Sequence, residues 1–220
     1  MNPIKKISFL LAAASAAGVL QAQQNYSSSP SAASDQPGVL GQSFTELGFG
    51  VQSLRHTSDE PFDATLRGNI PVSQNVDVSL GYGYSWLNGD TDIHNELLAA
   101  DTKFYTQLDN HMKPYIGGLV GYQWAKTDFD HQFPVAATSQ DRWVWGVSAG
   151  VEIPVGTFAF TPHVGYVDSM ESNSLGHYNY GAEAQHWFTQ TVGSYADVSY
   201  NDLRHENSTW TYVAGLRFRF

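Results

Sequence analysis

The feature that most constrains this chain is a strict alternation of apolar and small or polar residues from position 76 to position 86. Because successive side chains of a β-strand point to opposite faces, the segment predicts a strand with one wholly apolar face. The end of the chain repeats the alternation, with Tyr212, Leu216 and Phe220 among its apolar positions. Such apolar faces need either a protein core or lipid against them.

Ten segments of this kind follow one another from residue 43 to the C-terminus. The connections between them alternate between short turns and longer loops, and an even number of strands is usual in bacterial outer-membrane barrels. The predicted strands cover 43–54, 62–71, 76–87, 96–108, 113–125, 142–153, 157–167, 178–188, 192–201 and 208–220. We therefore expect an all-β fold, a transmembrane antiparallel up-and-down β-barrel of ten strands, with eight strands as the alternative.

The positions of the aromatic residues favour a membrane barrel over a soluble β-sandwich. Phe104, Phe158 and Phe220 are among the phenylalanines at one end of the strands. Five of the six tryptophans fall at the other end, beside the longer loops and on the apolar face: Trp86, Trp124, Trp143, Trp145 and Trp210. Membrane barrels carry an aromatic girdle at each interface, whereas a sandwich buries its aromatic residues centrally.

The N-terminal part of the chain has the features of an export signal followed by a tail. Lys5 and Lys6 precede an apolar, alanine-rich stretch, and Ala22 ends a cleavage site, so residues 1–22 are predicted to be a signal peptide. Residues 23–42 are rich in Ser, Ala, Gln and Pro and predict a flexible tail. The barrel is then assigned to 43–220.

Composition excludes several classes of function. The chain has no cysteine, which excludes disulfides and thiolate sites. Its formal net charge of −10 argues against a nucleic-acid partner, because phosphate binding needs a basic face.

Strand parity assigns a mixed set of charges to the interior of the barrel. Because an unpaired buried charge costs several kcal/mol, we expect cross-strand ion pairs among them. Inward-facing glycines leave room for Tyr105, Tyr115 and Tyr195. Ten strands lie close to the size at which side chains fill the interior, so we expect a largely filled lumen, with a narrow solute channel as the alternative. The inward charges are Glu46, Asp63, Asp77, Asp101, Glu152, Glu183, Asp197, Arg67, Lys103, Arg142, Arg217 and Arg219.

The longer loops are predicted to form an acidic external surface. A charged rim keeps a barrel wet, and divalent cations bridging the loops to lipopolysaccharide are a further expectation. The third of these loops, residues 126–141, carries Phe129 and Phe133 and is the best candidate for a contact surface. The acidic residues are Asp59, Glu60, Asp90, Asp92, Asp128, Asp130, Asp141, Asp168, Glu171, Asp202 and Glu206.

Each external connection, or its edge, also carries one histidine. Convergence on a transition metal is one interpretation, but no two of the histidines have a ligand spacing within one element, and we favour unrelated surface positions. We therefore assign no catalytic, cofactor-binding or metal residue. His163 is predicted to point inward and to pair with an acid. The external histidines are His56, His94, His131, His177 and His205.

Two segments resemble known proteins in detail. The block from Lys113 to Tyr122, KPYIGGLVGY, resembles a recurrent segment of the opacity-protein and outer-membrane-protein-A-like barrels. The ending GLRFRF resembles the C-terminal signal read by the outer-membrane assembly machinery, with Phe220 as its final aromatic residue. The resemblance implies a barrel in the bacterial outer membrane, in contact with lipid and lipopolysaccharide. Typical members of these families have eight strands rather than ten, and neither motif specifies an activity.

An enzymatic alternative comes from a partial resemblance to the omptin family of ten-stranded outer-membrane proteases. These enzymes activate water with an Asp pair and an Asp–His pair at the external rim. Asp90 and Asp92 resemble the first pair, whereas Asp202 and His205 stand three residues apart rather than two. We therefore expect a non-enzymatic barrel with a structural or surface-interaction role, and keep a small-solute channel and, remotely, a rim protease as alternatives.

Overall fold

A computed structural model of the protein describes residues 37–54, 60–87, 91–108, 111–129, 138–171, 176–203 and 208–220. Within these ranges the chain forms ten β-strands and no helix. No helix long and apolar enough to cross a bilayer occurs in the part of the chain that the structure describes. The strands are β1 (Phe44–Leu54), β2 (Phe62–Ser73), β3 (Val76–Leu87), β4 (Thr91–Tyr105), β5 (Lys113–Phe129), β6 (Thr138–Val155), β7 (Phe158–Ser169), β8 (His177–Trp187), β9 (Val192–Leu203) and β10 (Thr209–Arg219).

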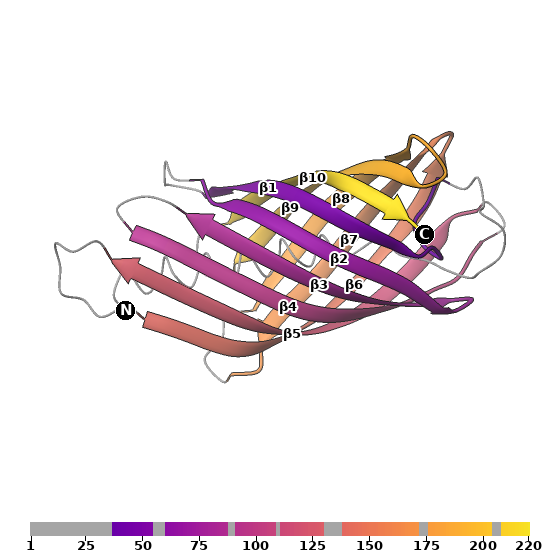
Figure 1. The fold of residues 1–220 in the computed structure, drawn as a ribbon. Helices are drawn as coiled ribbons and strands as arrows, with labels where there is room; N and C mark the ends of the chain where they lie inside the picture. The colour runs from indigo at the N-terminus through magenta and orange to yellow at the C-terminus, as the bar shows by residue number, and fades with distance from the viewer. Residues whose placement is uncertain are drawn as a thin grey trace.

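The ten strands close into a single antiparallel barrel. Each strand pairs with its neighbours in sequence, and β1 closes the circle by pairing with β10 from Phe44–Arg219 to Leu54–Thr209. The strands lie side by side and are tilted relative to the long axis of the barrel (Figure 1). The predicted ten-stranded up-and-down barrel is therefore confirmed, and the eight-stranded alternative is wrong.

The two ends of the barrel differ in their connections. Short turns at 74–75, 156–157 and 188–191 lie at one end, which we call the turn end. The C-terminus lies at this end as well (Figure 1). The opposite end, which carries the longer connections, is the loop end.

Three strands are longer at the loop end than the sequence predicts. β4, β5 and β6 contain 15, 17 and 18 residues, whereas the other strands contain 11 or 12. The β5–β6 ladder continues to Thr127–Thr138, while the β6–β7 ladder begins only at Val144–Ser169. The described residues of the predicted third loop, 126–129 and 138–141, therefore extend β5 and β6 as strand. Their polar sequence lacks apolar alternation, but backbone hydrogen bonds extend the ladder without it.

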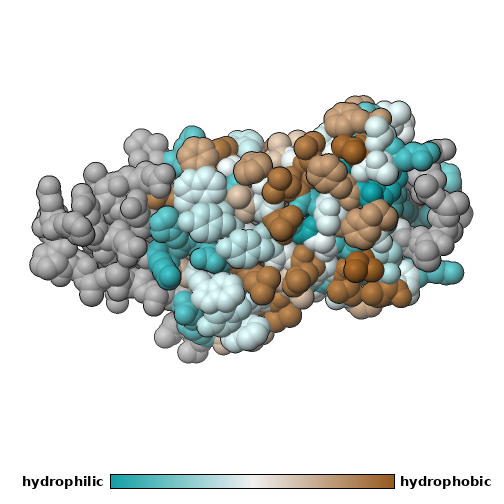
Figure 2. All heavy atoms as spheres, viewed as in Figure 1, coloured by the Kyte–Doolittle hydropathy of each residue, from teal (hydrophilic) through white to brown (hydrophobic). Residues whose placement is uncertain are grey.

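The apolar side chains coat the outside of the barrel rather than its centre. Leu66, Leu80, Val120 and Leu216, on four different strands, are each between 43 and 59% exposed. Exposed apolar side chains form a broad belt on the face shown in Figure 2, and paler aromatic groups lie toward the loop end. An apolar surface this extensive needs lipid against it, because soluble proteins rarely expose large contiguous apolar patches.

Candidate functional site

The lumen is lined by polar and charged side chains, as strand parity predicts. All seven acids expected to face inward are buried, and each is at most 4% exposed. Arg67, Lys103, Arg142 and Arg217 are buried with them, and Arg219 is half-buried. The interior of the barrel, rather than its rim, is therefore where ionisable groups concentrate among the described residues.

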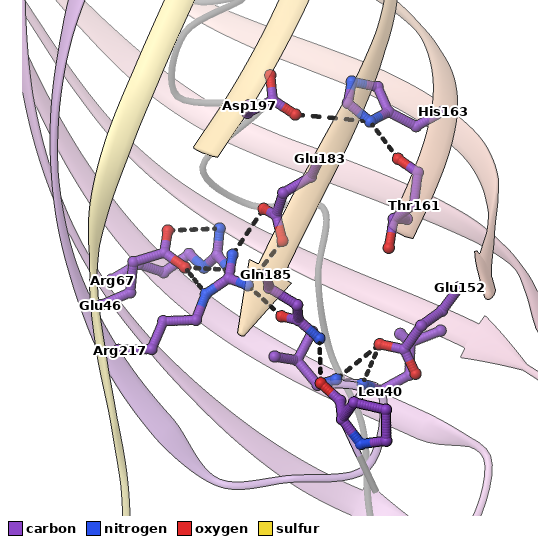
Figure 3. A network of polar contacts seen from close by, with 12 residues as sticks. Leu40, Glu46, Arg67, Glu152, Thr161, His163, Glu183, Gln185, Asp197 and Arg217 are labelled. Carbon is purple, nitrogen blue, oxygen red and sulfur yellow. Dashed lines mark hydrogen bonds and ion pairs between the residues drawn. The ribbon is translucent and has the colours of Figure 1, made fainter. Parts of the chain in front are cut away.

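A cluster of ion pairs around Arg217 crosses the turn-end half of the lumen (Figure 3). Arg217 of β10 donates from Nε to Glu46 Oε2 of β1 at 2.7 Å, and from Nη1 and Nη2 to the two carboxylate oxygens of Glu183 on β8, both at 2.7 Å. Its Nη1 also donates to Gln185 Oε1. Arg67 of β2 lies 3.3 Å from the other oxygen of Glu46. The predicted cross-strand ion pairs are confirmed, and one guanidinium joins strands that are not neighbours in the barrel.

The Tyr195 ring contacts this cluster, and glycines leave space for the ring. The Arg217 guanidinium lies 4.2 Å from the centroid of the Tyr195 ring, a distance that allows a cation–π contact. A Cβ atom built on Gly215 would lie 2.6 Å from that ring, and one built on Gly48 would meet the Tyr195 hydroxyl. The expectation that inward glycines leave room for tyrosines is thus confirmed at Tyr195, and Gly150 does the same for Tyr115.

Residues 37–42 enter the turn end of the lumen and bind its wall through their backbone. Glu152 Oε2 accepts hydrogen bonds from the backbone N–H groups of Val39 and Leu40, at 2.6 and 2.9 Å. Lys113 Nζ donates to the Leu40 carbonyl at 2.5 Å. Fixed polar partners thus hold the backbone within residues 37–42, the last six residues of the predicted tail. Residues 23–36, like the predicted signal peptide 1–22, lie outside the described residues.

The side chains of the same segment complete a small apolar cluster at the turn end. Val39 and Leu40 are 0 and 1% exposed and pack with Phe44, Tyr105 and Tyr115. Trp187 packs against this cluster from β8. Burying two branched side chains stabilises the seated segment by a few kcal/mol, at roughly 1.5–3 kcal/mol for each fully buried side chain.

The loop-end half of the lumen is lined mainly by amides and hydroxyls. Asp63 accepts hydrogen bonds from Gln52 Nε2 at 2.8 and 2.9 Å and from the Ser85 hydroxyl. On the other strands the contacts are Gln123 to Asn95 at 2.8 Å, Arg142 Nε to Gln123 at 2.8 Å, and Asn179 to Asn201 at 2.8 Å. Between this layer and the Arg217 cluster, β4 to β7 contribute an apolar stripe of Leu97, Ala99, Leu119, Val144 and Val167.

The described histidines do not converge. His94 lies on the outer face of β4, where its ring stacks on Tyr84, whereas His177 is buried in the lumen at 2% exposure. His56, His131 and His205 lie outside the described residues. His163 is buried in the lumen, as predicted, and its Nδ1 lies 3.8 Å from Asp197 Oδ2, close to an acid but beyond hydrogen-bond distance. Among the described residues, no group of three His, Asp or Glu side chains could hold a metal ion.

The other candidate residues at the rim are only partly described. Asp92 lies within β4 rather than in a loop, and Asp202 lies near the end of β9 with an exposed side chain. Asp90 and His205, which complete the two protease-like pairs, fall outside the described residues, as does Phe133. The protease alternative and the cation-binding loops therefore stay predictions.

Comparison with known proteins identifies the fold. No protein-family model matches the sequence, and no curated protein is similar to it in sequence. The structure is similar to the transport unit of the autotransporter AIDA-I from Escherichia coli, with a TM-score of 0.50 and 11% identity, over 94% of this chain and 98% of that one. Two other similar structures are the translocator domain of the autotransporter NalP from Neisseria meningitidis and Neisserial surface protein A. Their TM-scores are 0.49 and 0.43, their identities 10 and 13%, and the matches cover 81% of this chain in both cases, with 88 and 96% of the other chains.

The closed antiparallel barrel, its apolar coat and the likeness in fold to the AIDA-I transport unit agree. The protein is a small outer-membrane β-barrel. Its location in the bacterial outer membrane, predicted from the strand pattern, follows from the same observations. In this class the short turns face the periplasm, so the turn end of the lumen, with the Arg217 cluster and residues 37–42, is its periplasmic mouth.

Sequence reasoning missed two parts of this lumen. Lys113 faces inward with Tyr115, and its Nζ lies 3.7 Å from Glu152 Oε1. Strand parity could have found Lys113, because it lies two residues before the inward-facing Tyr115. The seated segment had a weaker signal, since Val39 and Leu40 are an isolated apolar pair in a polar tail.

Proposed function

We propose that this outer-membrane barrel is a closed envelope protein, whose filled lumen is a structural core and whose outer hairpin serves surface interaction. The observation that carries the proposal is the Arg217 cluster, in which one buried guanidinium binds carboxylates from β1 and β8. Ion-paired side chains that project into the lumen from β8, β10, β1 and β2 leave less room for the continuous water column that a channel needs. Residues 37–42 support the same conclusion, because they fill space at the periplasmic mouth beside the cluster.

The protein is expected to conduct little or no current. Refolded full-length mature chain, added to planar lipid bilayers, should give no steady openings, because the buried ion pairs cost several kcal/mol to separate. A larger outer-membrane porin in the same bilayers would verify the sensitivity of the measurement. Steady, large single-channel currents from the protein would contradict the closed lumen.

A narrow channel for small polar solutes is the second candidate. The amide- and hydroxyl-rich layer in the loop-end half favours it, because such groups replace the hydration of a polar solute. Small but regular openings that a particular solute blocks would favour the channel over the closed core.

The β5–β6 hairpin is the part of the molecule best placed to meet a partner. The length difference between β6 and β7 is six residues (18 minus 12), and a strand rises about 3.4 Å per residue. The hairpin therefore extends by roughly 20 Å more than a strand of the length of β7 would. Long surface projections of this kind commonly carry function.

Replacing residues 128–138 with a two-residue Asn-Gly turn is expected to separate surface interaction from assembly. The shortened barrel should refold with an unchanged yield and with a free energy of unfolding within about 0.5 kcal/mol of the full chain, because the lumen contacts described above come from other residues. Cells that carry it should lose any adherence that the full chain confers. A chain that fails to assemble would contradict this division.

We further propose that the role is not enzymatic and that the partners are outer-membrane lipid and lipopolysaccharide, with divalent cations at the acidic loops. Phe220, 72% exposed at the end of the apolar row on β10, supports recognition by the assembly machinery, which reads such C-terminal aromatic residues. The buried position of the described ionisable groups supports a structural role for them. Cleavage of a dibasic peptide by the protein, lost on Asp90→Ala substitution, would favour the protease alternative.

A further inference from the structure

The backbone of residues 37–42 is bound from several walls of the barrel at once. Besides the bonds to Glu152 on β6 and Lys113 on β5, Gln185 Nε2 on β8 donates to the Pro37 carbonyl at 2.8 Å. Asn69 Nδ2 on β2 donates to the Gln42 carbonyl at 2.8 Å. In the strand order β2 lies four places from β6 and four from β8, so the segment spans the periplasmic mouth.

These contacts recognise the peptide backbone rather than particular side chains. Glu152 accepts the N–H groups of two consecutive residues, while Lys113 donates to the carbonyl of the second. The amides of Gln185 and Asn69 each donate to a further carbonyl. Four side chains of the wall therefore form a site that an extended main chain fits, and Figure 3 shows Leu40 held beside Glu152 and Gln185 near the Arg217 cluster.

Residues 37–42 can dissociate from the lumen wall without disrupting the strands of the barrel and without leaving Glu152 or Lys113 as an unpaired charge. The ten strands close among themselves, and residues 37–42 belong to none of them. When the segment departs, Glu152 and Lys113 still compensate each other, because Lys113 Nζ lies only 3.7 Å from Glu152 Oε1. Glu152 and Lys113 therefore have a partner both when residues 37–42 are bound and when they are absent.

We propose that Glu152, Lys113, Gln185 and Asn69 form a binding site for extended peptide main chain in the periplasmic mouth. The chain's own residues 37–42 occupy it as a tethered, displaceable plug. This inference deepens the closed lumen proposed above, on which it rests for the state of the mouth. The chemical class of the ligand is a polypeptide backbone, with two small branched apolar side chains seated among aromatic rings.

Cysteine labelling of residue 40 tests the plug directly. The chain has no cysteine, so Leu40→Cys introduces a unique thiol while keeping the backbone contacts. In the refolded full-length mature chain, a water-soluble maleimide should label this thiol at least 100-fold more slowly than in the urea-unfolded chain. In a Glu152→Leu/Lys113→Met background, which keeps the net charge but removes the contacts to the Val39 and Leu40 backbone, labelling should accelerate at least tenfold.

A matched control removes an acid and a base from the other end of the lumen. Asp63→Asn/Arg142→Met should leave the labelling rate of Leu40→Cys unchanged, because both residues lie in the loop-end layer. Rapid labelling in the otherwise unchanged barrel, or undiminished protection in the Glu152→Leu/Lys113→Met background, would overturn the proposal.

Conductance measured in parallel separates the plug from the closed lumen. Steady currents with residue 40 still protected contradict the closed lumen alone, whereas a non-conducting barrel with rapid labelling contradicts the plug alone.

Discussion

Replacing Arg217 by methionine is expected to lower the free energy of unfolding by about 3–5 kcal/mol, because the substitution removes one partner of a buried ion pair. Methionine preserves much of the volume but leaves the Glu183 carboxylate without the two 2.7 Å hydrogen bonds that now compensate its burial. Glu46 is less affected, because Arg67 remains within 3.3 Å of it. Equilibrium unfolding in guanidinium chloride, followed by tryptophan fluorescence of the barrel in lipid vesicles, measures the loss.

Two further variants show whether lost pairing, rather than lost packing, is responsible. In an Arg217→Met/Glu183→Gln double variant most of the loss should be recovered, because no charge is then left buried without its partner. Arg219→Met serves as the matched control on the same strand. The Arg219 guanidinium lies 3.9 Å from the Trp187 ring centroid, and loss of a cation–π contact costs only about 1 kcal/mol. Equal losses for the two arginine substitutions would contradict the central role of Arg217.

The strands could be predicted from the sequence because the two faces of the barrel wall lie in different environments. Lipid outside and a polar lumen inside impose a period of two wherever the wall crosses the membrane, as in Val78, Leu80 and Tyr82. The prediction failed at the loop-end extensions of β4, β5 and β6, where the alternation no longer holds. Segments such as 126–129 and 138–141 therefore read as loops, although backbone pairing carries them on as strands.

Strand parity could predict which side chains face the lumen, but it could not predict which of them contact one another. Strand parity assigned Glu46, Glu183 and Arg217 to the interior correctly. It could not show that Arg217 reaches over β9 to Glu183, since parity does not give the relative height of residues on strands that are not neighbours. That height depends on the stagger of the closed barrel, which follows from the register of all ten ladders together.

The seated segment shows a different limit. The composition of residues 23–42 predicts disorder, because so few of them can bury apolar surface. Yet Val39 and Leu40 are buried and the segment is bound, since the lumen supplies aromatic partners for these two side chains and polar partners for the backbone. Local composition reports what a segment can bury by itself. It does not report the apolar and polar partners that distant strands provide for the segment.

Gly215→Ala is the second substitution with a large expected effect, a loss of about 3 kcal/mol in the free energy of unfolding or failure to assemble. The added Cβ would lie 2.6 Å from the Tyr195 ring and 2.9 Å from Gly48 Cα, and would also meet the Leu47 carbonyl oxygen. Two of these three neighbours are backbone atoms of β1, which pairs with β10 at the closing seam and cannot move without disturbing that pairing.

The matched control is Gly118→Ala, on the lipid-facing side of β5, where a new Cβ meets nothing within 4 Å. Since alanine suits a strand better than glycine, that variant should be as stable as the parent or more stable by about 0.5 kcal/mol. The refolding yields of the two variants, and their free energies of unfolding in guanidinium chloride, measure the difference. A Gly215→Ala barrel as stable as the Gly118→Ala barrel would contradict the close packing around Gly215 at the seam.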